Sequence, residues 1–379
     1  MNENPAFLSE QLITYIGNKR SLLGFIEEAV EYVKKDLNKD KLECLDLFSG
    51  SGIVSRFLKK HSSLLCVNDL ELYSNIINHC YLANKDEINL EKLKDLHEKL
   101  ISKTKEDISK GNKGFISELY APKDLDSIQS GERCFYTPRN AQYIDCMRQN
   151  IQSLVPSEYQ QFFIAPLLSE ASVHANTAGI FKGFYKNSKT GIGQFGGNGK
   201  NALSRICSDI NLPFPVFSEH KCGIKIFQEE ANALAASPEL YCDLTEKKFD
   251  LVYMDPPYNQ HPYGSNYFML NLIAEYKKPD SEKISRISGI PSDWNRSFYN
   301  KKRIASQTFE DLIETIRSKY IVISFNNEGF ISKEEMEEIL NRHGRVKTLE
   351  SAYNTFRGSR NLKNRSIHVS EYLFILKKN

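Results

Sequence analysis

The sequence has no Cys-x-x-Cys pair, although it contains eight cysteines, at positions 44, 66, 80, 134, 146, 207, 222 and 242. A zinc site or a disulfide framework needs cysteines at short, regular spacings, so neither is expected. Several cysteines, such as Cys44 and Cys66, lie inside apolar runs. These features predict reduced, buried thiols in a cytosolic protein and no metal site.

Long apolar runs and an excess of one charge are also missing. No segment is apolar for long enough to span a membrane, and no signal peptide is present, so we expect a cytoplasmic protein. The formal net charge is only +2, so a nucleic-acid partner has to be inferred from local clusters of cations. The 379 residues, 40% hydrophobic and 26% charged, suffice for one large globular domain or two moderate ones.

The chain is organised around the stretch Asp255-Pro256-Pro257-Tyr258. The preceding run, 249–254, is apolar, which predicts a buried parallel strand that the double proline ends. Since proline has no N–H, the Pro256 carbonyl and the Asp255 carboxylate are neighbouring acceptors, suited to an amino group with two hydrogens. Tyr258 offers a flat face on which a base can stack. The alternative is a buried strand that runs into a proline-rich turn.

A second unit of strand, turn and helix lies near the N-terminus. Residues 42–48 have the pattern of a strand, Ser49-Gly50-Ser51-Gly52 that of a glycine turn, and 53–60 that of a helix. Glycines there let the backbone approach a ligand, and the helix start offers free N–H groups. The third glycine of the dinucleotide fingerprint is missing, so a turn in an unrelated α/β unit is the alternative. The next predicted strand, 64–68, ends at Asp69, placed to bind ribose hydroxyls or to cap the following helix.

The alternation of strand and helix stops between residues 84 and 222. The segments 89–110, 138–154 and 157–168 have helical periodicity. Further strands are predicted at 223–227, 249–254, 320–325, 346–353 and 369–376. The sequence therefore predicts an α/β protein with a mostly parallel sheet and a closing antiparallel hairpin. Residues 1–84 and 223–379 form one domain, and 85–222 form a largely helical insertion.

Two stretches carry cations without acids. Residues 171–205 combine glycines and aromatic rings with cations, including Lys182, Lys186, Lys189 and Lys200. This composition suits a surface that binds phosphates and touches bases, with a plain surface loop as the alternative. The loop 354–368 has four cations, Arg357, Arg360, Lys363 and Arg365. We expect that loop to contact phosphates.

The chain resembles the S-adenosylmethionine-dependent DNA adenine-N6 methyltransferases of the Dam-like (D12 class) family. The segments that carry the resemblance are 15–20, 46–52, 68–71 and 255–258, in this order. Three further segments are similar to parts of that family: 176–197, 259–267 and 324–329. The first of them is rich in asparagine and glycine. The resemblance covers both ends of the chain well and the helical middle poorly. It implies a Rossmann-like methyltransferase sheet with an inserted target-recognition region.

The resemblance also implies roles for individual residues, with S-adenosylmethionine as the cofactor. The cofactor pocket would consist of Tyr15, Gly17, Lys19, Asp46, Phe48, Gly50, Gly52 and Asp69, of which Asp69 binds the ribose. Glu230 is preferred for the cofactor adenine, with Asp243 as the alternative. The catalytic motif would be Asp255, Pro256, Pro257 and Tyr258. Asn176 and the lysines of 171–205 would contact DNA.

The activity that the resemblance implies is site-specific methylation of N6 of an adenine flipped out of duplex DNA, in a restriction-modification system. A cognate restriction endonuclease would act separately, and we expect a monomer at the bacterial nucleoid. The alternatives are a cytosine-N4 DNA methyltransferase, an RNA adenine methyltransferase and a catalytically decayed DNA-binding module. The large insertion favours DNA, since sequence-specific DNA enzymes carry a target-recognition region, and the intact motifs favour an enzyme.

Overall fold

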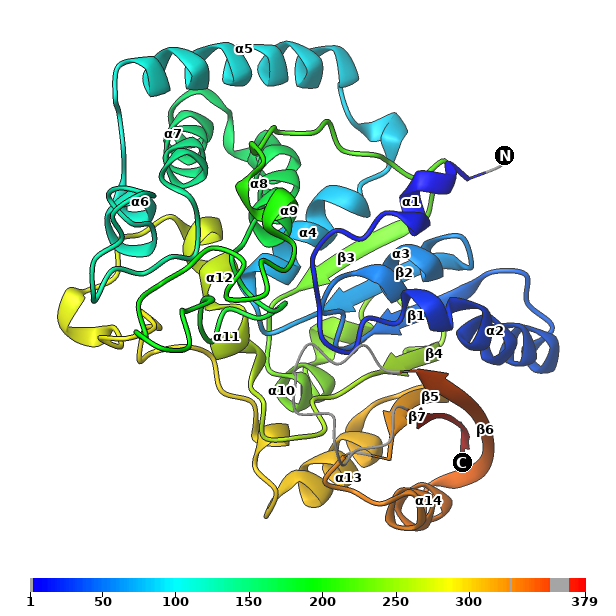
Figure 1. The fold of residues 1–379 in the computed structure, drawn as a ribbon. Coiled ribbons are helices and arrows are strands. Elements are labelled where there is room, and N and C mark those ends of the chain that lie inside the picture. The colour runs from blue at the N-terminus through cyan, green and yellow to red at the C-terminus, as the bar shows by residue number, and fades with distance from the viewer. Residues whose placement is uncertain (1–2, 328, 355–367) are drawn as a thin grey trace.

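A computed structural model describes residues 3–327, 329–354 and 368–379. Within these residues the centre is a seven-stranded sheet in the order β3-β2-β1-β4-β5-β7-β6 (Figure 1). The strands are β1 (Leu42–Asp46), β2 (Ser62–Asn68), β3 (Gly223–Phe227), β4 (Phe249–Met254), β5 (Ser318–Asn326), β6 (Gly344–Asn354) and β7 (His368–Lys378). The neighbouring strands β3 and β2, β2 and β1, β1 and β4, and β4 and β5 are parallel. Strand β7 runs antiparallel to both β5 and β6. This confirms the predicted α/β sheet with its closing antiparallel hairpin.

Helices cover both faces of the sheet, which explains why its central strands are apolar without alternation. Every residue of β1 and β4 is buried. One face packs against α2 (Leu23–Leu37) and α3 (Ile53–Lys59). The other face packs against α10 (Ala231–Ala236), α13 (Ala305–Thr315) and α14 (Lys333–Asn341). The central strands are therefore held rigidly where they end in the predicted motifs.

A helical region packs beside the sheet around a core of its own. Its longer helices are α4 (Leu72–Tyr81), α5 (Leu90–Ser109), α6 (Phe115–Tyr120), α7 (Pro138–Leu154), α8 (Ser157–Val173) and α12 (Phe268–Glu275). Shorter elements are α1 (Pro5–Ser9), α9 (Leu203–Cys207), α11 (Tyr263–Asn266) and the 3-10 turns η1 (Arg20–Leu22), η2 (Lys85–Glu87), η3 (Pro238–Tyr241), η4 (Ser281–Lys283) and η5 (Phe298–Asn300). Since α4 and α12 share this core, it extends beyond 85–222, and the domain boundaries stay a prediction.

The turns that follow β1, β2 and β4 lie at one edge of the sheet, because these strands are parallel neighbours. In the register, Asp46 at the end of β1 lies opposite Val67 of β2 and Tyr253 of β4. The strand order reverses between β1 and β4, and such a switch point leaves a crevice outside the carboxyl ends of the strands. The glycine turn and the Asp-Pro-Pro-Tyr turn therefore flank the same crevice.

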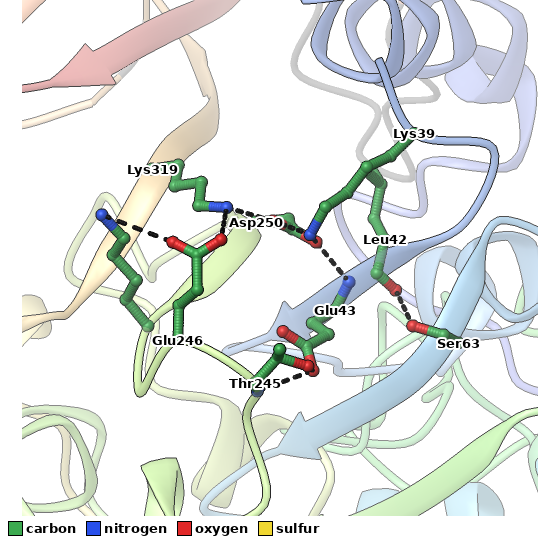
Figure 2. A network of polar contacts seen from close by, with 9 residues as sticks. Lys39, Leu42, Glu43, Ser63, Thr245, Glu246, Asp250 and Lys319 are labelled. Atoms are coloured by element: carbon green, nitrogen blue, oxygen red, sulfur yellow. Dashed lines mark hydrogen bonds and ion pairs between the residues drawn. The ribbon is translucent and has the colours of Figure 1, made fainter. Parts of the chain in front are cut away.

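Ion pairs close the opposite, amino edge of the sheet (Figure 2). The Asp250 carboxylate in β4 lies 2.8 Å from Lys39 Nζ and 3.1 Å from Lys319 Nζ, and it accepts the Glu43 N–H at 3.0 Å. Burial opposes the ionisation of Asp250, but these partners hold its pKa below the usual value. Thr245 Oγ1 donates to the Glu43 carboxylate at 2.8 Å. The network fixes the starts of β1, β4 and β5 relative to one another.

The described part of the chain contains no helix long and apolar enough to cross a membrane. Nor does that part contain a group of three or more His, Cys, Asp or Glu side chains that could hold a metal. All eight cysteines are free; Cys207 and Cys242 are exposed, and the other six are buried. Most thiols are thus buried, as the sequence predicts.

Candidate active site

A cavity that opens to solvent lies at the carboxyl edge of the sheet, with about 870 Å³ of empty space including the solvent at its mouth. Its walls come from the turns after β1, β2, β3 and β4 and from the N-terminal turn that contains Tyr15. Six acids line it: Asp46, Asp69, Glu71, Glu229, Glu230 and Asp255. Lys19 is the one cation among the described residues that form its walls. The excess of acids in its walls favours a cationic ligand.

The glycine turn brings the backbone close to the residue expected to bind ribose. Gly50 and Gly52 have φ of +53° and +74°, in the left-handed region that favours glycine. A Cβ on Gly50 would lie 2.7 Å from the Tyr15 ring. The Gly50 N–H donates to Asp69 Oδ2 at 2.7 Å, and the Glu71 N–H donates to Asp69 Oδ1 at 2.9 Å. Burial raises the pKa of Asp69 to about 6 in spite of these bonds.

Asp46 and Phe48 line the cavity from the end of β1. Asp46 is completely buried, and its Oδ2 accepts a hydrogen bond from Ser55 Oγ at 2.6 Å. Its Oδ1 is buried without a hydrogen-bond partner among the described residues, and burial raises the Asp46 pKa to about 7. Gly52 does not line the cavity; it caps α3, and a Cβ there would lie 3.0 Å from Asn78 Oδ1.

Asp255 is held at the cavity by a buried lysine. Lys19 is only 4% exposed, and its Nζ lies 3.0 Å from Asp255 Oδ2 and 3.2 Å from Glu371 Oε1. Ser324 Oγ donates to the same Glu371 oxygen at 2.7 Å. Burial raises the pKa of Asp255 to about 6, against the charge of Lys19. Burial also opposes the charge of Lys19, but the two carboxylates raise the pKa of Lys19 well above its usual value.

The two oxygens of Asp255 are therefore unequal. Oδ2 is fixed by Lys19, whereas Oδ1 is buried and has no hydrogen-bond partner among the described residues. Lys19 lines the cavity as expected of a pocket residue, but its ammonium contacts the Asp255 carboxylate. Gly17, with φ of +75°, accepts from Lys19 Nζ through its carbonyl at 3.2 Å and does not itself line the cavity. Sequence reasoning missed Glu371, whose one signal is an acid directly before the apolar run of β7.

Aromatic side chains pack around the Asp-Pro-Pro-Tyr turn. Pro257 lines the cavity, whereas Pro256 and Tyr258 do not. The Tyr258 ring is partly buried and stands edge-on to Phe325, with 5.7 Å between the ring centroids. The Tyr258 carbonyl accepts the Phe330 N–H at 2.8 Å, so the turn after β5 supports the turn after β4.

Stacked tyrosines fix the N-terminal turn beside Asp255. Tyr15 stacks with Tyr263 and Tyr267 at centroid distances of 5.1 and 4.8 Å. The Tyr267 hydroxyl accepts the Ile16 N–H at 2.8 Å. Since Tyr263 and Tyr267 follow the Asp-Pro-Pro-Tyr turn in the chain, these contacts set the position of Lys19 relative to Asp255.

Of the two acids considered for the cofactor adenine, only one lines the cavity. Glu230 lies in its wall, where it also caps α10 by accepting the Ala233 N–H at 3.0 Å. Asp243 is exposed, forms an ion pair with Lys225 and is not among the cavity residues. The structure thus brings Glu230 to the site and leaves Asp243 outside it. The contact with adenine stays a prediction.

The residues expected to contact DNA have different surroundings. The exposed ones are Lys182, Lys186, Lys189 and Lys200. Asn176 is completely buried; its Nδ2 donates to the Cys134 carbonyl at 2.8 Å, and its Oδ1 accepts the Gly196 N–H at 2.9 Å. The structure corrects the expectation for Asn176, because an amide used at both ends inside the loop does not reach DNA. The remaining four, Arg357, Arg360, Lys363 and Arg365, lie outside the described residues.

Comparison with known proteins places this site in a family. A family model for the D12 class N6 adenine-specific DNA methyltransferases matches residues 15–195 and 218–339. The chain is 30% identical to the type II methyltransferase M.NlaIII of Neisseria lactamica, over 97% of this chain and 99% of that protein. It is 28% identical to M.CviAII of Paramecium bursaria Chlorella virus 1, over 96% and 98%. With M.FokI of Planomicrobium okeanokoites it shares 29% identity over 96% of this chain but 52% of that protein.

The family model extends through most of the helical middle, which the motifs alone cover poorly. It also includes the glycine turn, the Asp-Pro-Pro-Tyr turn and the Lys19 turn that meet at the cavity. The chain therefore belongs to the D12 class of N6 adenine-specific DNA methyltransferases.

Proposed function

We propose that this enzyme transfers the methyl group of S-adenosylmethionine to N6 of an adenine flipped out of duplex DNA. The observation that carries the proposal is the unpartnered Oδ1 of Asp255, in the wall of the same cavity as the glycine turn and Asp69. A free carboxylate oxygen in the wall of the proposed cofactor cavity supports an acceptor for an amine beside the cofactor.

The residues of the cavity fit this cofactor. S-adenosylmethionine carries a sulfonium, an ammonium and a carboxylate, so its net positive charge matches the acidic walls. The buried, unpartnered Asp46 Oδ1 is an acceptor available at the end of β1. Asp46 would hold the methionine end, Asp69 the ribose and Glu230 the adenine. When bound, the cofactor supplies an electrophilic methyl group.

Asp255 and the Pro256 carbonyl would orient the target amine. The N6 lone pair of adenine is delocalised into the ring, so the amine is a poor nucleophile. Acceptance of its two hydrogens by Asp255 Oδ1 and the Pro256 carbonyl favours a pyramidal nitrogen whose lone pair points outward. Orientation and electrostatics then drive an in-line displacement without a strong base. Lys19 fixes Oδ2, which leaves Oδ1 to the amine.

The burial of Asp255 supports base flipping. Its side chain is only 19% exposed, so a base inside a duplex cannot reach it. The adenine would have to leave the helix and enter the site, as for other enzymes that act on DNA bases. Tyr258, directly after the catalytic prolines, would stack on the extruded base.

We also propose that the enzyme belongs to a restriction-modification system. Relatives are described as type II methyltransferases or, as for StsI of Streptococcus sanguinis, as modification methylases. A cognate endonuclease would act separately, on the same DNA in the bacterial cytoplasm, and the methyltransferase would work as a monomer. Residues 85–222 would select the target sequence, with 171–206 nearest the bases.

The test is methyl transfer by the purified protein from labelled S-adenosylmethionine to duplex DNA, to RNA and to buffer alone. Mass spectrometry of the digested nucleosides identifies the product, and single-molecule sequencing gives its context. We expect N6-methyladenine in DNA, at one short sequence. The proposal would be contradicted if the labelled methyl group appeared in N4-methylcytosine or in RNA, or if no nucleic acid were labelled.

A further inference from the structure

The segment 294–303, termed here the lip segment, joins the cavity wall to an exposed basic surface. It connects the loop after α12 to α13 and is drawn in gold in Figure 1. Residues 294–309 contain no acid, and the segment lies outside the motifs that carry the family resemblance. Asn295, Ser297 and Asn300 line the cavity. Between them, Arg296 and Phe298 are exposed, and Tyr299 is buried.

One end of the lip segment is fixed to the ribose side of the cavity. Asn295 Nδ2 donates to the Leu70 carbonyl at 3.2 Å and to Glu71 Oε2 at 3.3 Å. Gly264 permits this approach, because a Cβ there would lie 2.6 Å from the Asn295 carbonyl oxygen. The segment is thus tied to the turn that carries Asp69.

The other end is fixed to the catalytic side. Asn300 Nδ2 donates at 2.7 Å to the carbonyl of Asn259, the residue directly after Tyr258. Tyr299 is buried, stands edge-on to Phe48 at 5.3 Å and donates to Asn232 at 2.7 Å. The backbone between these anchors therefore has a fixed place beside the cavity.

The outer side of the lip segment is basic. Its exposed cations, which form no ion pair within the described residues, are Arg296, Lys301, Lys302 and Arg303. Arg296 lies 4.4 Å over the ring of Trp294, and Lys301 lies 4.6 Å over the ring of Phe298. The next acid in the chain, Glu310, pairs with Arg342 instead. These cations are thus not neutralised by the protein around them.

Charge and connectivity both call for cations at this place. The cavity has six acids against one lysine, an arrangement that repels phosphate. A nucleotide whose base enters the cavity stays joined to its flanking phosphates, which must then lie at the cavity edge. We propose that Arg296, Lys301, Lys302 and Arg303 bind the DNA phosphates beside the target nucleotide. This inference rests on the proposed base flipping and adds the surface that holds the backbone.

The test removes three positive charges from the lip segment and, as a matched control, three from the amino edge of the sheet. The lip variant is Lys301→Gln/Lys302→Gln/Arg303→Gln. The control is Lys35→Gln/Lys41→Gln/Lys248→Gln, whose side chains are also exposed and lie outside 85–222. Lys35 is near the end of α2, and Lys41 and Lys248 directly precede β1 and β4, at the edge of the sheet opposite the cavity. Fluorescence anisotropy measures the binding of short random-sequence duplex DNA at several salt concentrations, and calorimetry measures S-adenosylmethionine binding.

We expect the lip variant to bind every duplex about tenfold more weakly or worse, because non-specific affinity comes from phosphate contacts. The slope of log affinity against log salt should fall by about 0.9 per lost contact. The control should bind DNA like the unaltered protein, and all three proteins should bind S-adenosylmethionine equally. Equal DNA binding by the lip variant and the control would overturn the inference. A lip variant that loses affinity for RNA but keeps its affinity for duplex DNA would also overturn it.

The inference and the proposed function fail separately. If the unaltered protein methylates adenine in DNA while the lip variant binds DNA like the control, the inference alone is wrong. If the unaltered protein transfers no methyl group to DNA, the proposed function fails and the inference fails with it.

Discussion

Replacement of Asp255 by Asn separates the charge of this side chain from its shape. The Lys19 ammonium, 3.0 Å from Oδ2, only donates hydrogen bonds, so the Asn amide would turn its oxygen to the lysine. The amide NH2 would then take the place of the unpartnered Oδ1, where the target amine also donates. Because two donors face each other, we expect Asp255→Asn to be as inactive as Asp255→Ala.

Each variant removes one of the two acceptors proposed for the amine. Loss of one positioned hydrogen-bonding group in an enclosed site lowers kcat by about 10²–10³, or about 2.7–4 kcal/mol. Glu371 stays 3.2 Å from Lys19, so the buried ammonium keeps one carboxylate, and both variants should fold. The affinity for S-adenosylmethionine should stay within a few-fold, because the glycine turn and Asp69 are unchanged.

Single-turnover methylation of duplex DNA, together with calorimetric titration of the cofactor, measures both quantities. The double variant Lys19→Gln/Asp255→Asn is the matched control. Its Gln can donate to Glu371 and accept from the Asn amide, which frees the Asn oxygen for the amine, so part of the lost rate should return. A near wild-type rate for Asp255→Asn would refute the orientation by Lys19. A near wild-type rate for Asp255→Ala would show that Asp255 has no part in the mechanism.

Four further outcomes are expected. Tyr258→Ala should slow single-turnover methylation, because lost stacking on the base raises the barrier by about 1–3 kcal/mol. The loss should be smaller for a mispaired adenine, which is easier to extrude. Equal losses on paired and mispaired substrates would argue against stacking. The rate at saturating cofactor should fall as the pH drops through about 6, where Asp255 gains a proton and loses an acceptor, and a flat profile would contradict this role. Asp250→Ala should destabilise the protein in urea by about 3 kcal/mol, because buried ion pairs at the amino edge lose their shared carboxylate, without a change in cofactor affinity once folded. Exchange of 85–222 with a relative should move the methylated sequence, and an unchanged sequence would show that specificity lies elsewhere.

The elements that the sequence predicts well are those that local chemistry defines. The double proline ends β4 at Met254, and the glycine turn adopts positive φ, as their residue types require. The helix predicted at 138–154 has those bounds because Thr137 caps it and proline is its first residue. The helix predicted at 157–168 continues to Val173, since its last turn is buried against neighbouring elements. Packing, which no local pattern encodes, decided that boundary.

The parts of the site that were not predictable depend on contacts between distant segments. The sequence assigns Lys19 to a cofactor turn and says nothing of Glu371, because their proximity to Asp255 exists only in the folded sheet. Composition likewise marks 171–205 as basic and polar without separating exposed lysines from Asn176, whose amide shapes the loop from inside. Residue type thus predicted which chemical groups line the cavity, but it did not predict which partners their side chains contact.

The antiparallel direction of β7 explains how Glu371 reaches the catalytic edge. In the register of β5 and β7, Glu371 lies opposite Asn326, at the carboxyl end of β5. A residue near the start of a parallel strand would lie at the amino edge instead, beside the Asp250 network. Reversal of β7 therefore brings an acid from the beginning of a strand to the place where Lys19 meets Asp255. The closing hairpin thus contributes to the proposed catalytic site, because it supplies the second carboxylate that raises the pKa of the buried lysine.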